Sequence, residues 1–177
     1  MIPFPEKRYR ALVVDPPWQY RNKNTGGSMK SGASAKYPTM SLEEICALPV
    51  PDICERDAVL FLWGTTPLAD YPFEVMKAWK FKYKTKIYWH NTGNLGLGNW
   101  FRGQVEECLV CVRGDVKAFH LQKPNFIQSK AREHSRKPEE FFQLIGPAVE
   151  NINPKIELFA RERRPGWDCW GYGVPAP

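Results

Sequence analysis

The chain has 177 residues, of which 43% are hydrophobic and 14% aromatic, enough to bury a substantial core as one domain spanning residues 1–177. Its 25 lysines and arginines exceed its 19 acids, and the net charge of +6 favours a polyanionic partner without proving one. The first eight residues contain no apolar core of a signal peptide, and no apolar run approaches the roughly eighteen residues of a membrane span. We therefore expect a cytoplasmic protein that does not contact a membrane.

Five apolar runs predict buried strands. They span Arg10–Asp15, Ala58–Trp63, Lys84–His90, Glu107–Arg113 and Lys155–Ala160. Polar, glycine-rich stretches at 22–34 and 91–103 predict long loops, and loops of such length are often functional. The segment 115–136 is irregular and basic, and no element is predicted there.

Two helices are predicted in the first half of the chain. Ser41, with an acid three residues later, has capping-box spacing and starts a short helix that ends near Leu48. Thr66 and the proline after it start a second helix that reaches Lys80, and Pro72 kinks or delays that helix.

A third helix is predicted with Pro138 at its first position and two acids in its first turn. Apolar residues between 141 and 145 form a stripe at helical spacing, and Gly146-Pro147 breaks the helix. Because strands alternate with helices along the chain, the fold class is α/β with a mainly parallel sheet. Two strands joined by a loop alone predict one antiparallel pair.

Five cysteines stand at positions 46, 54, 108, 111 and 169, an odd and irregular set that does not predict a disulfide framework. Cys108 and Cys111 match a C-x-x-C pattern, but they lie in a strand-like run, where residues three apart point to opposite faces. A structural zinc site would need a second pair of ligands. We expect reduced, mostly buried thiols and no metal site.

The most informative motif, Asp15-Pro16-Pro17-Trp18, directly follows the first apolar run. It stands at the carboxyl end of a strand, where open α/β sheets place ligands. The two prolines fix φ and remove two N–H donors, so the turn is rigid and presents acceptors. Such a turn suits the NH₂ group of a planar heterocycle, and Trp18 offers that ring a flat face. The alternative is an Asp-Pro turn that ends a strand beside a core tryptophan.

Further motifs follow in order along the chain. They are Tyr37-Pro38-Thr39-Met40-Ser41, Leu60–Thr65, a Gly-rich stretch with Trp100 after Trp89, Glu106–Val110 with Arg113-Gly114, Ser135–Pro138, Ile156–Arg161, and Gly166-Trp167-Asp168 with Trp170-Gly171. Together with Asp15–Trp18, this series resembles the mRNA (N6-adenosine) methyltransferase 70-kDa-subunit family, whose bacterial and phage relatives modify adenine in DNA. The resemblance covers nearly the whole chain.

The resemblance implies a Rossmann-like class I S-adenosylmethionine-dependent methyltransferase fold. The fold would be circularly permuted, with the strand that carries the catalytic tetrapeptide before the cofactor strand, and its sheet mostly parallel with an antiparallel strand near one edge. The implied activity is transfer of a methyl group from S-adenosylmethionine to the exocyclic N6 amine of adenine in DNA. The alternatives are N6 methylation of RNA, a catalytically silent nucleic-acid-binding partner subunit, and a methyltransferase that acts on a small molecule or a protein amide.

The chemistry assigns a role to the tetrapeptide. The N6 lone pair is delocalised into the ring, so the amine needs help at its protons. The Asp15 carboxylate would accept one N–H and the Pro16 carbonyl the other, and both bonds strengthen as positive charge develops on nitrogen. An adenine in a duplex hides this atom, so a duplex substrate would have to flip its base.

On the substrate side, the resemblance implies that Trp18 and Tyr37 line an aromatic slot for the base. Trp63 and Trp89, at or near the ends of two strands, either lie near this slot or are ordinary core aromatics. Glu106 either reads the base or is a solvated acid.

On the cofactor side, the implied binding residues are Lys137, Glu157, Phe159, Arg161, Arg163 and Tyr172. Lys137 would pair with the methionyl carboxylate beside a helix amino terminus, or is a surface lysine. The arginines at 161 and 163 would hold the ribose and the methionine tail, or belong to a solvated or phosphate-binding loop. Tyr172-Gly173 departs from the family, whose members carry Asn followed by an amide or acid there.

Nucleic acid is the expected partner, with DNA favoured over RNA. Phosphate contacts are expected from the basic residues of loops 22–36 and 114–134, namely Lys23, Lys30, Lys36, Lys117, Lys123, Lys130 and Arg132. A homodimer or a partner subunit is the alternative source of sequence specificity.

Overall fold

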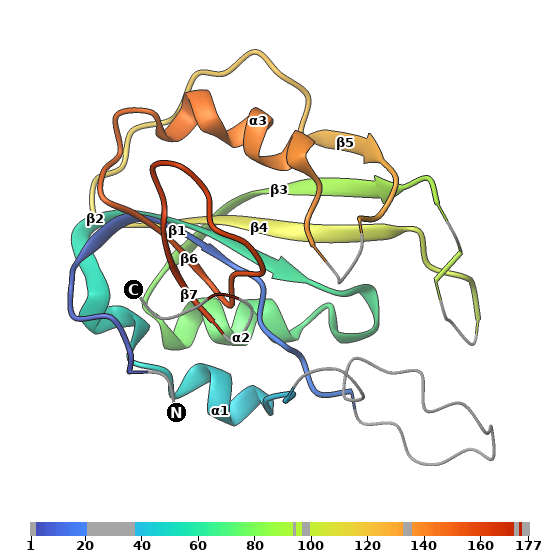
Figure 1. The fold of residues 1–177 in the computed structure, drawn as a ribbon, viewed down its shortest axis with the longest axis horizontal. Helices are drawn as coiled ribbons and strands as arrows, with labels where there is room; N and C mark the ends of the chain where they lie inside the picture. The colour runs from blue at the N-terminus through green and yellow to red at the C-terminus, as the bar shows by residue number, and fades with distance from the viewer. Residues whose placement is uncertain are drawn as a thin grey trace.

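The computed structural model describes residues 3–20, 38–93, 95–96, 100–132, 136–171 and 174. They form a seven-stranded sheet with helices on both faces (Figure 1). The strands are β1 (Tyr9–Val14), β2 (Cys54–Gly64), β3 (Lys82–Asn91), β4 (Val105–Arg113), β5 (Phe126–Ser129), β6 (Lys155–Leu158) and β7 (Asp168–Trp170). Their order in the sheet is β5-β3-β4-β2-β1-β6-β7.

One strand runs against the rest of the described sheet. The interior strand β1 pairs in parallel with β2 and β6, β6 with β7, and β3 with β5. Strand β4 is antiparallel to both of its neighbours, β2 and β3. The expected fold class, a mostly parallel α/β sheet with an antiparallel strand near one edge, is confirmed, and β3 and β4 are the predicted antiparallel pair joined by a loop.

The sheet is covered on both faces. Helices α1 (Leu42–Cys46) and α2 (Tyr71–Ala78) pack on one face, and α3 (Glu139–Val149) packs on the other (Figure 1). Because successive strand residues point to opposite faces, Leu12 and Val14 join the first core while Ala11 and Val13 join the second. The unbroken apolar run before Asp15 is therefore the sequence of a strand buried on both sides.

The structure confirms the predicted start of α1, but α2 begins later in the chain than predicted. The Ser41 hydroxyl accepts from Glu44 N at 3.2 Å, and Ser41 N donates to the Glu44 carboxylate at 2.7 Å, so the capping box is confirmed. The second helix does not start at Thr66. Residues Thr66–Leu68 form a separate 3₁₀ turn, and α2 begins at Tyr71 with Pro72 near its start, where a missing N–H costs nothing.

Two details predicted for α3 are wrong. Pro138 is the residue before the helix, with an extended ψ of 148°, rather than its first helical residue. The helix also continues through Pro147 to Val149. Pro147 is exposed, so water can bond the carbonyl that loses its N–H partner, and the buried Ile145 and Val149 hold the last turn against the sheet.

Two edge strands are absent from the sequence prediction. Strand β5 lies inside the segment 115–136, for which no element is predicted, and β7 follows the predicted strands. Both strands are short, so they carry little periodicity, and β5 pairs with β3, a strand distant in sequence.

The cysteines are arranged as expected. All five are free thiols, and Cys108 and Cys111 belong to the cores on opposite faces of the sheet. In the part of the chain that the structure describes, no three His, Cys, Asp or Glu side chains are grouped to hold a metal ion. None of the described helices is both long and apolar enough to cross a membrane.

Two glycines provide a matched test of the fold. Gly114 ends β4 at φ +67°, and a Cβ there would lie 2.0 Å from Asp57 Oδ1 and 2.4 Å from Arg56 O. We expect Gly114→Ala to lower the free energy of unfolding by roughly 1–3 kcal/mol. Gly146 lies in α3 with nothing within 4 Å of an added Cβ, so Gly146→Ala is expected to raise it by up to about 1 kcal/mol.

Urea unfolding of both variants measures these changes. Shifts of the same sign in the two variants would contradict the positions assigned to these glycines.

Candidate active site

The candidate site lies where several strand ends meet. Asp15 follows β1, Gly64 ends β2, and Phe159 follows β6, and these strands are parallel, so their carboxyl ends share one edge of the sheet. Strand β4 runs the other way, so its first residues reach the same edge, where Glu107 pairs with Gly64. Glu106 is thereby brought beside Asp15.

Lys137 joins the two acids. Its Nζ lies 3.1 Å from Asp15 Oδ1 and 2.8 Å from Glu106 Oε2, and 4.9 Å from the ring centroid of Trp63. The side chains of Lys137, Asp15 and Glu106 are 12%, 22% and 36% exposed, so solvent screens these ion pairs only in part. We call Asp15, Lys137 and Glu106 the charge bridge.

The surroundings shift the protonation of the charge bridge. Burial raises the pKa of the Asp15 carboxyl, an effect that the Lys137 ammonium opposes and Glu106 reinforces. Burial lowers the pKa of the Lys137 ammonium, but Asp15 and Glu106 outweigh it, and the net pKa is raised. Lys137 therefore keeps its proton at neutral pH, and Asp15 is a more basic acceptor than an exposed aspartate.

The turn after Asp15 is held by a neighbouring segment. Pro16 O accepts from Trp18 N at 2.9 Å, and Pro17 O accepts from Met40 N at 2.8 Å. Met40 belongs to the Tyr37–Ser41 motif, so the described part of that motif supports the turn. A carbonyl oxygen has two lone pairs, so Pro16 O retains capacity for a second donor.

Trp18 is anchored within the core rather than displayed at the surface. It is 5% exposed, its indole Nε1 donates to Trp63 O at 3.2 Å, and its ring meets Tyr71 edge-on at 6.2 Å. Little of its face is open in this structure. Tyr37, the other residue expected to line the slot, lies outside the described residues.

Trp63 and Trp89 are both buried, and they meet edge-to-face at 6.3 Å. Trp63 also packs on Phe141 of α3 at 4.8 Å, and Trp89 Nε1 donates to Ser129 Oγ at 3.0 Å. The structure therefore places both in the core, which is one of the two positions that the sequence left open. The Trp63 ring nevertheless contacts the Lys137 ammonium through a cation–π interaction.

The β6 side of the site carries a buried acid. Glu157 Oε2 is inaccessible to solvent and has no hydrogen-bond partner. Burial raises the pKa of Glu157 from 4.5 to about 7, and the Arg164 guanidinium opposes the shift. A buried oxygen without a partner is costly, so this acceptor suits a ligand that donates a hydrogen bond.

Phe159 lies at a strained turn beside Glu157. Its φ is +61°, a left-handed value that a phenylalanine rarely adopts. The last residue of β7 holds it there, because Ala160 N donates to Trp170 O at 3.0 Å and Trp170 packs on the Phe159 ring. A Cβ on Gly171 would lie 2.8 Å from Phe159 Cα, so only glycine fits against this turn. Such strain is often found at functional sites.

An arginine-glutamate cluster next to α3 was not predicted from the sequence. Its members are Arg132, Arg136, Glu139, Glu162 and Arg164. Arg164 Nη1 lies 2.8 Å from Glu139 Oε1, and Glu162 accepts from Arg132 at 3.1 Å and from Arg136 at 3.3 Å. Arg132, expected at phosphate, is thus compensated by Glu162. The only signal in the sequence is the alternation of charge at 161–164, which a solvated loop would also show.

The remaining cofactor-side residues take different positions. Arg161 is partly buried, and its charge opposes the rise that burial causes in the pKa of Asp15. Arg163 is exposed. Tyr172 lies outside the described residues.

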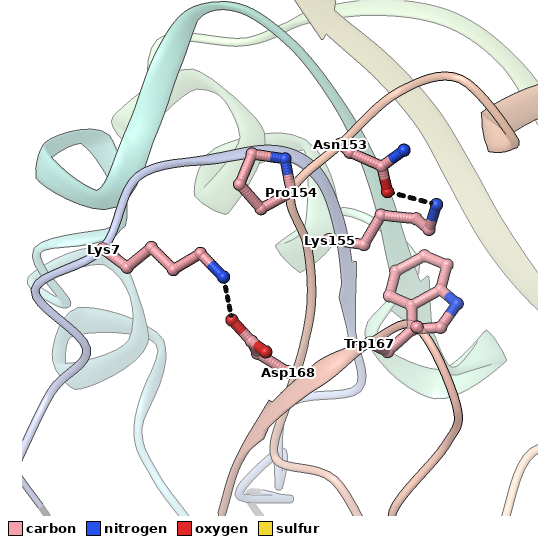
Figure 2. A pocket seen from close by; sticks show the side chains of 7 residues that line it. Lys7, Asn153, Pro154, Lys155, Trp167 and Asp168 are labelled. Carbon is pink, nitrogen blue, oxygen red and sulfur yellow. Dashed lines mark hydrogen bonds and ion pairs between the residues drawn. The ribbon is translucent and has the colours of Figure 1, made fainter.

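A depression of about 410 Å³ lies at the opposite edge of the sheet, where β1, β6 and β7 begin (Figure 2). Its polar groups are paired: Lys7 with Asp168 at 2.8 Å, and Lys155 with Asn153 at 2.6 Å. It is therefore separate from the charge bridge.

The strand order, the antiparallel β4 and the Asp15–Trp18 turn at the carboxyl edge define a Rossmann-like methyltransferase. Residues 9–173 match the family model MT-A70, and the chain belongs to that family.

Relatives agree with this assignment. The chain is 33% identical to the Type II methyltransferase M.MunI of a Mycoplasma species, over 97% of this chain and 80% of that protein. It is 27% identical to the human N(6)-adenosine-methyltransferase catalytic subunit METTL3, over 93% of this chain and 28% of the human protein. It is also 27% identical to the mouse N(6)-adenine-specific methyltransferase METTL4, over 95% of this chain and 38% of that protein. The chain thus spans most of the bacterial relative and a minor part of the mammalian ones.

The burial of Glu157 predicts a pH-dependent stability. Below pH 4.5 the folded and unfolded states both hold the proton, and between 4.5 and about 7 only the folded state does, so stability falls as pH rises through this range. Glu157→Gln cannot lose a proton. We expect its stability relative to the wild type to increase from pH 5 to pH 8, by at most about 3 kcal/mol.

Thermal unfolding of both proteins at half-unit pH steps measures this difference. A difference that stays constant from pH 5 to 8 would show that Glu157 titrates normally.

Proposed function

We propose that the protein transfers a methyl group from S-adenosylmethionine to the N6 amine of adenine in DNA. The observation that carries this proposal is the Asp15–Pro16 turn, which presents a partly buried carboxylate and a backbone carbonyl together at the carboxyl edge of the sheet. The bacterial relative M.MunI, a Type II methyltransferase, supports DNA as the substrate.

Asp15 and Pro16 act on the protons of the amine. When bound, S-adenosylmethionine supplies a methyl group that its sulfonium activates toward a nucleophile. Asp15 accepts one N–H and Pro16 O the other, which localises electron density on the nitrogen. Burial makes Asp15 a stronger acceptor, and both bonds gain as positive charge develops on the amine. The nitrogen becomes acidic once alkylated, so Asp15 need not remove a proton beforehand.

Lys137 sets the orientation of Asp15. Its ammonium bonds to Asp15 Oδ1, and we assign Oδ2 to the substrate amine. The rigid turn and this ion pair together hold the acceptor before the substrate arrives, which is the condition for electrostatic preorganisation. Glu106, which bonds Lys137 on its other side, is the residue that we propose to contact the base.

The described residues fit the cofactor. Glu157 Oε2 is a buried acceptor without a partner and suits an ammonium or hydroxyl donor, while the protonated Lys137 suits a carboxylate. Phe159 and Arg161, after β6, complete this side, and Arg163 and Tyr172 are the further binding residues that we propose.

Nucleic acid binding is supported by the net charge of +6. Lys117, Lys123 and Lys130 are exposed and remain candidates for phosphate contacts, whereas the lysines of the 22–36 loop lie outside the described residues. A DNA-modifying enzyme works in the compartment that holds the DNA, so we propose the cytoplasm of a bacterial host. RNA is the second candidate substrate, favoured by the likeness to METTL3.

Methyl transfer from labelled S-adenosylmethionine to duplex DNA, single-stranded DNA and RNA tests the proposal. We expect N6-methyladenine in digested DNA. Cofactor binding without transfer to any nucleic acid would instead indicate a silent subunit, and transfer to glutamine peptides alone would indicate a protein amide methyltransferase.

Asp15→Asn tests the mechanism, because it keeps the shape of the side chain and removes its charge. We expect kcat to fall by at least about 10²-fold, the scale for losing one preorganised charge-stabilising group, while the Kd for S-adenosylmethionine changes little. Steady-state kinetics and calorimetric titration measure the two quantities.

Asp70→Asn is the matched control, because Asp70 is exposed and its side chain makes no capping bond to α2. Its kcat is expected to equal that of the wild type. Near-normal turnover of Asp15→Asn would remove Asp15 from the mechanism.

A further inference from the structure

Two aromatic residues adjacent in sequence are exposed to solvent on a connection at the same edge of the sheet as the candidate site. Trp100 is 94% exposed and Phe101 is 91% exposed, on the connection between β3 and β4. The described residues of this connection, 92–93, 95–96 and 100–104, lie beyond the ends of the two strands (Figure 1). Large aromatics dominate cores, so two of them left uncovered side by side indicate a surface that receives a partner.

The chain around the rings is braced. Arg102 Nε donates to Gly96 O at 2.5 Å, and Gly96 N donates to Gly103 O at 2.8 Å. A Cβ on Gly96 would lie 2.7 Å from Gly103 O, so glycine at position 96 allows this close approach. The guanidinium of Arg102 is therefore used to close the connection, and Trp100 and Phe101 are presented outward from it.

Hydrogen bonds to neighbouring segments fix both ends of the connection, the end of β3 and the start of β4. Thr66 Oγ1 donates to Val105 O at 2.9 Å, and Asn91 Oδ1 accepts from Ala131 N at 2.9 Å. Val105 directly precedes Glu106, the acid that bonds Lys137 in the charge bridge. The rings thus stand a few residues from the catalytic edge, on a support fixed at both ends.

An exposed lysine lies next to the base of the same connection. Lys130 is exposed and directly precedes Ala131, which bonds the base of the connection at Asn91. An exposed cation at the base of a connection that carries exposed aromatics matches a nucleic acid, which offers phosphates and base faces together. A purely apolar protein surface would leave the lysine uncompensated.

We propose that Trp100 and Phe101 form a wedge that enters the base stack of duplex DNA next to the target adenine. The inference rests on the proposed function. An amine at Asp15 is reachable only when its base leaves the helix, and side chains that enter the gap offset the lost stacking. The two exposed rings would enter the stack, and the Arg102–Gly96 bond would hold the connection that carries them. Glu106, at the start of β4 after this connection, belongs to the charge bridge.

The double variant Trp100→Ala/Phe101→Ala tests the wedge. Both side chains are exposed, so the fold is expected to persist. On duplex DNA we expect kcat/KM to fall roughly tenfold or more, the scale for losing a base–aromatic stack. On the same duplex with an abasic site opposite the target adenine, where flipping needs less help, the loss is expected to shrink.

Tyr83→Ala is the matched control, because Tyr83 is 43% exposed near the opposite end of β3. It is expected to leave both substrates at wild-type rates. Binding of a fluorescein-labelled duplex, measured by anisotropy without cofactor, gives a readout independent of methylation, and only the double variant is expected to weaken it.

The outcomes separate the wedge from the proposed function. If the wild type methylates no nucleic acid but its duplex binding depends on the two rings, the proposed function fails and the surface remains a nucleic-acid contact. If the double variant binds and methylates the duplex like the wild type, the wedge is wrong. If light scattering shows that the double substitution instead dissociates a dimer and leaves duplex binding intact, the rings serve a second copy of the chain and the wedge is likewise overturned.

Discussion

The site depends on one ammonium group held between two carboxylates. Lys137 joins the end of β1 through Asp15, the start of β4 through Glu106, and the entry to α3, which begins two residues later. Removing the ammonium would leave two partly buried carboxylates near each other without a counter-ion, which is strongly destabilising in proteins. The charge bridge therefore fixes the relative positions of three chain segments and also orients the acid that we assign to the substrate amine.

The reversed direction of β4 makes this bridge possible. In a sheet of parallel strands alone, the start of β4 would lie at the far edge, away from Asp15. Because β4 is antiparallel to β2 and β3, Glu106 reaches the catalytic edge, and the connection that carries Trp100 and Phe101 emerges there too. One topological feature thus brings an acid and an exposed aromatic pair to the same side of the molecule.

The parts of the fold that local sequence predicts are those whose causes are local. The capping box at Ser41 and the hydrogen bond from Trp18 N to Pro16 O each join residues close together in the chain, and the capping box forms as expected. The helix α3 passes through Pro147 because buried residues on either side hold it, and β5 forms because β3 offers it a partner. Those causes lie in residues distant along the chain, which a local pattern does not record.

The sequence by itself determined the rigid acceptor turn after the first strand, the buried strands, and the family to which the motifs belong, because proline geometry, apolar runs and residue order are properties of the chain alone. Only the tertiary structure decided that Lys137 bonds Asp15 and Glu106, that Trp63 and Trp89 lie in the core, and that Glu157 is buried without a partner. These facts depend on distances between segments far apart in sequence, and such distances are set by strand order and side-chain packing.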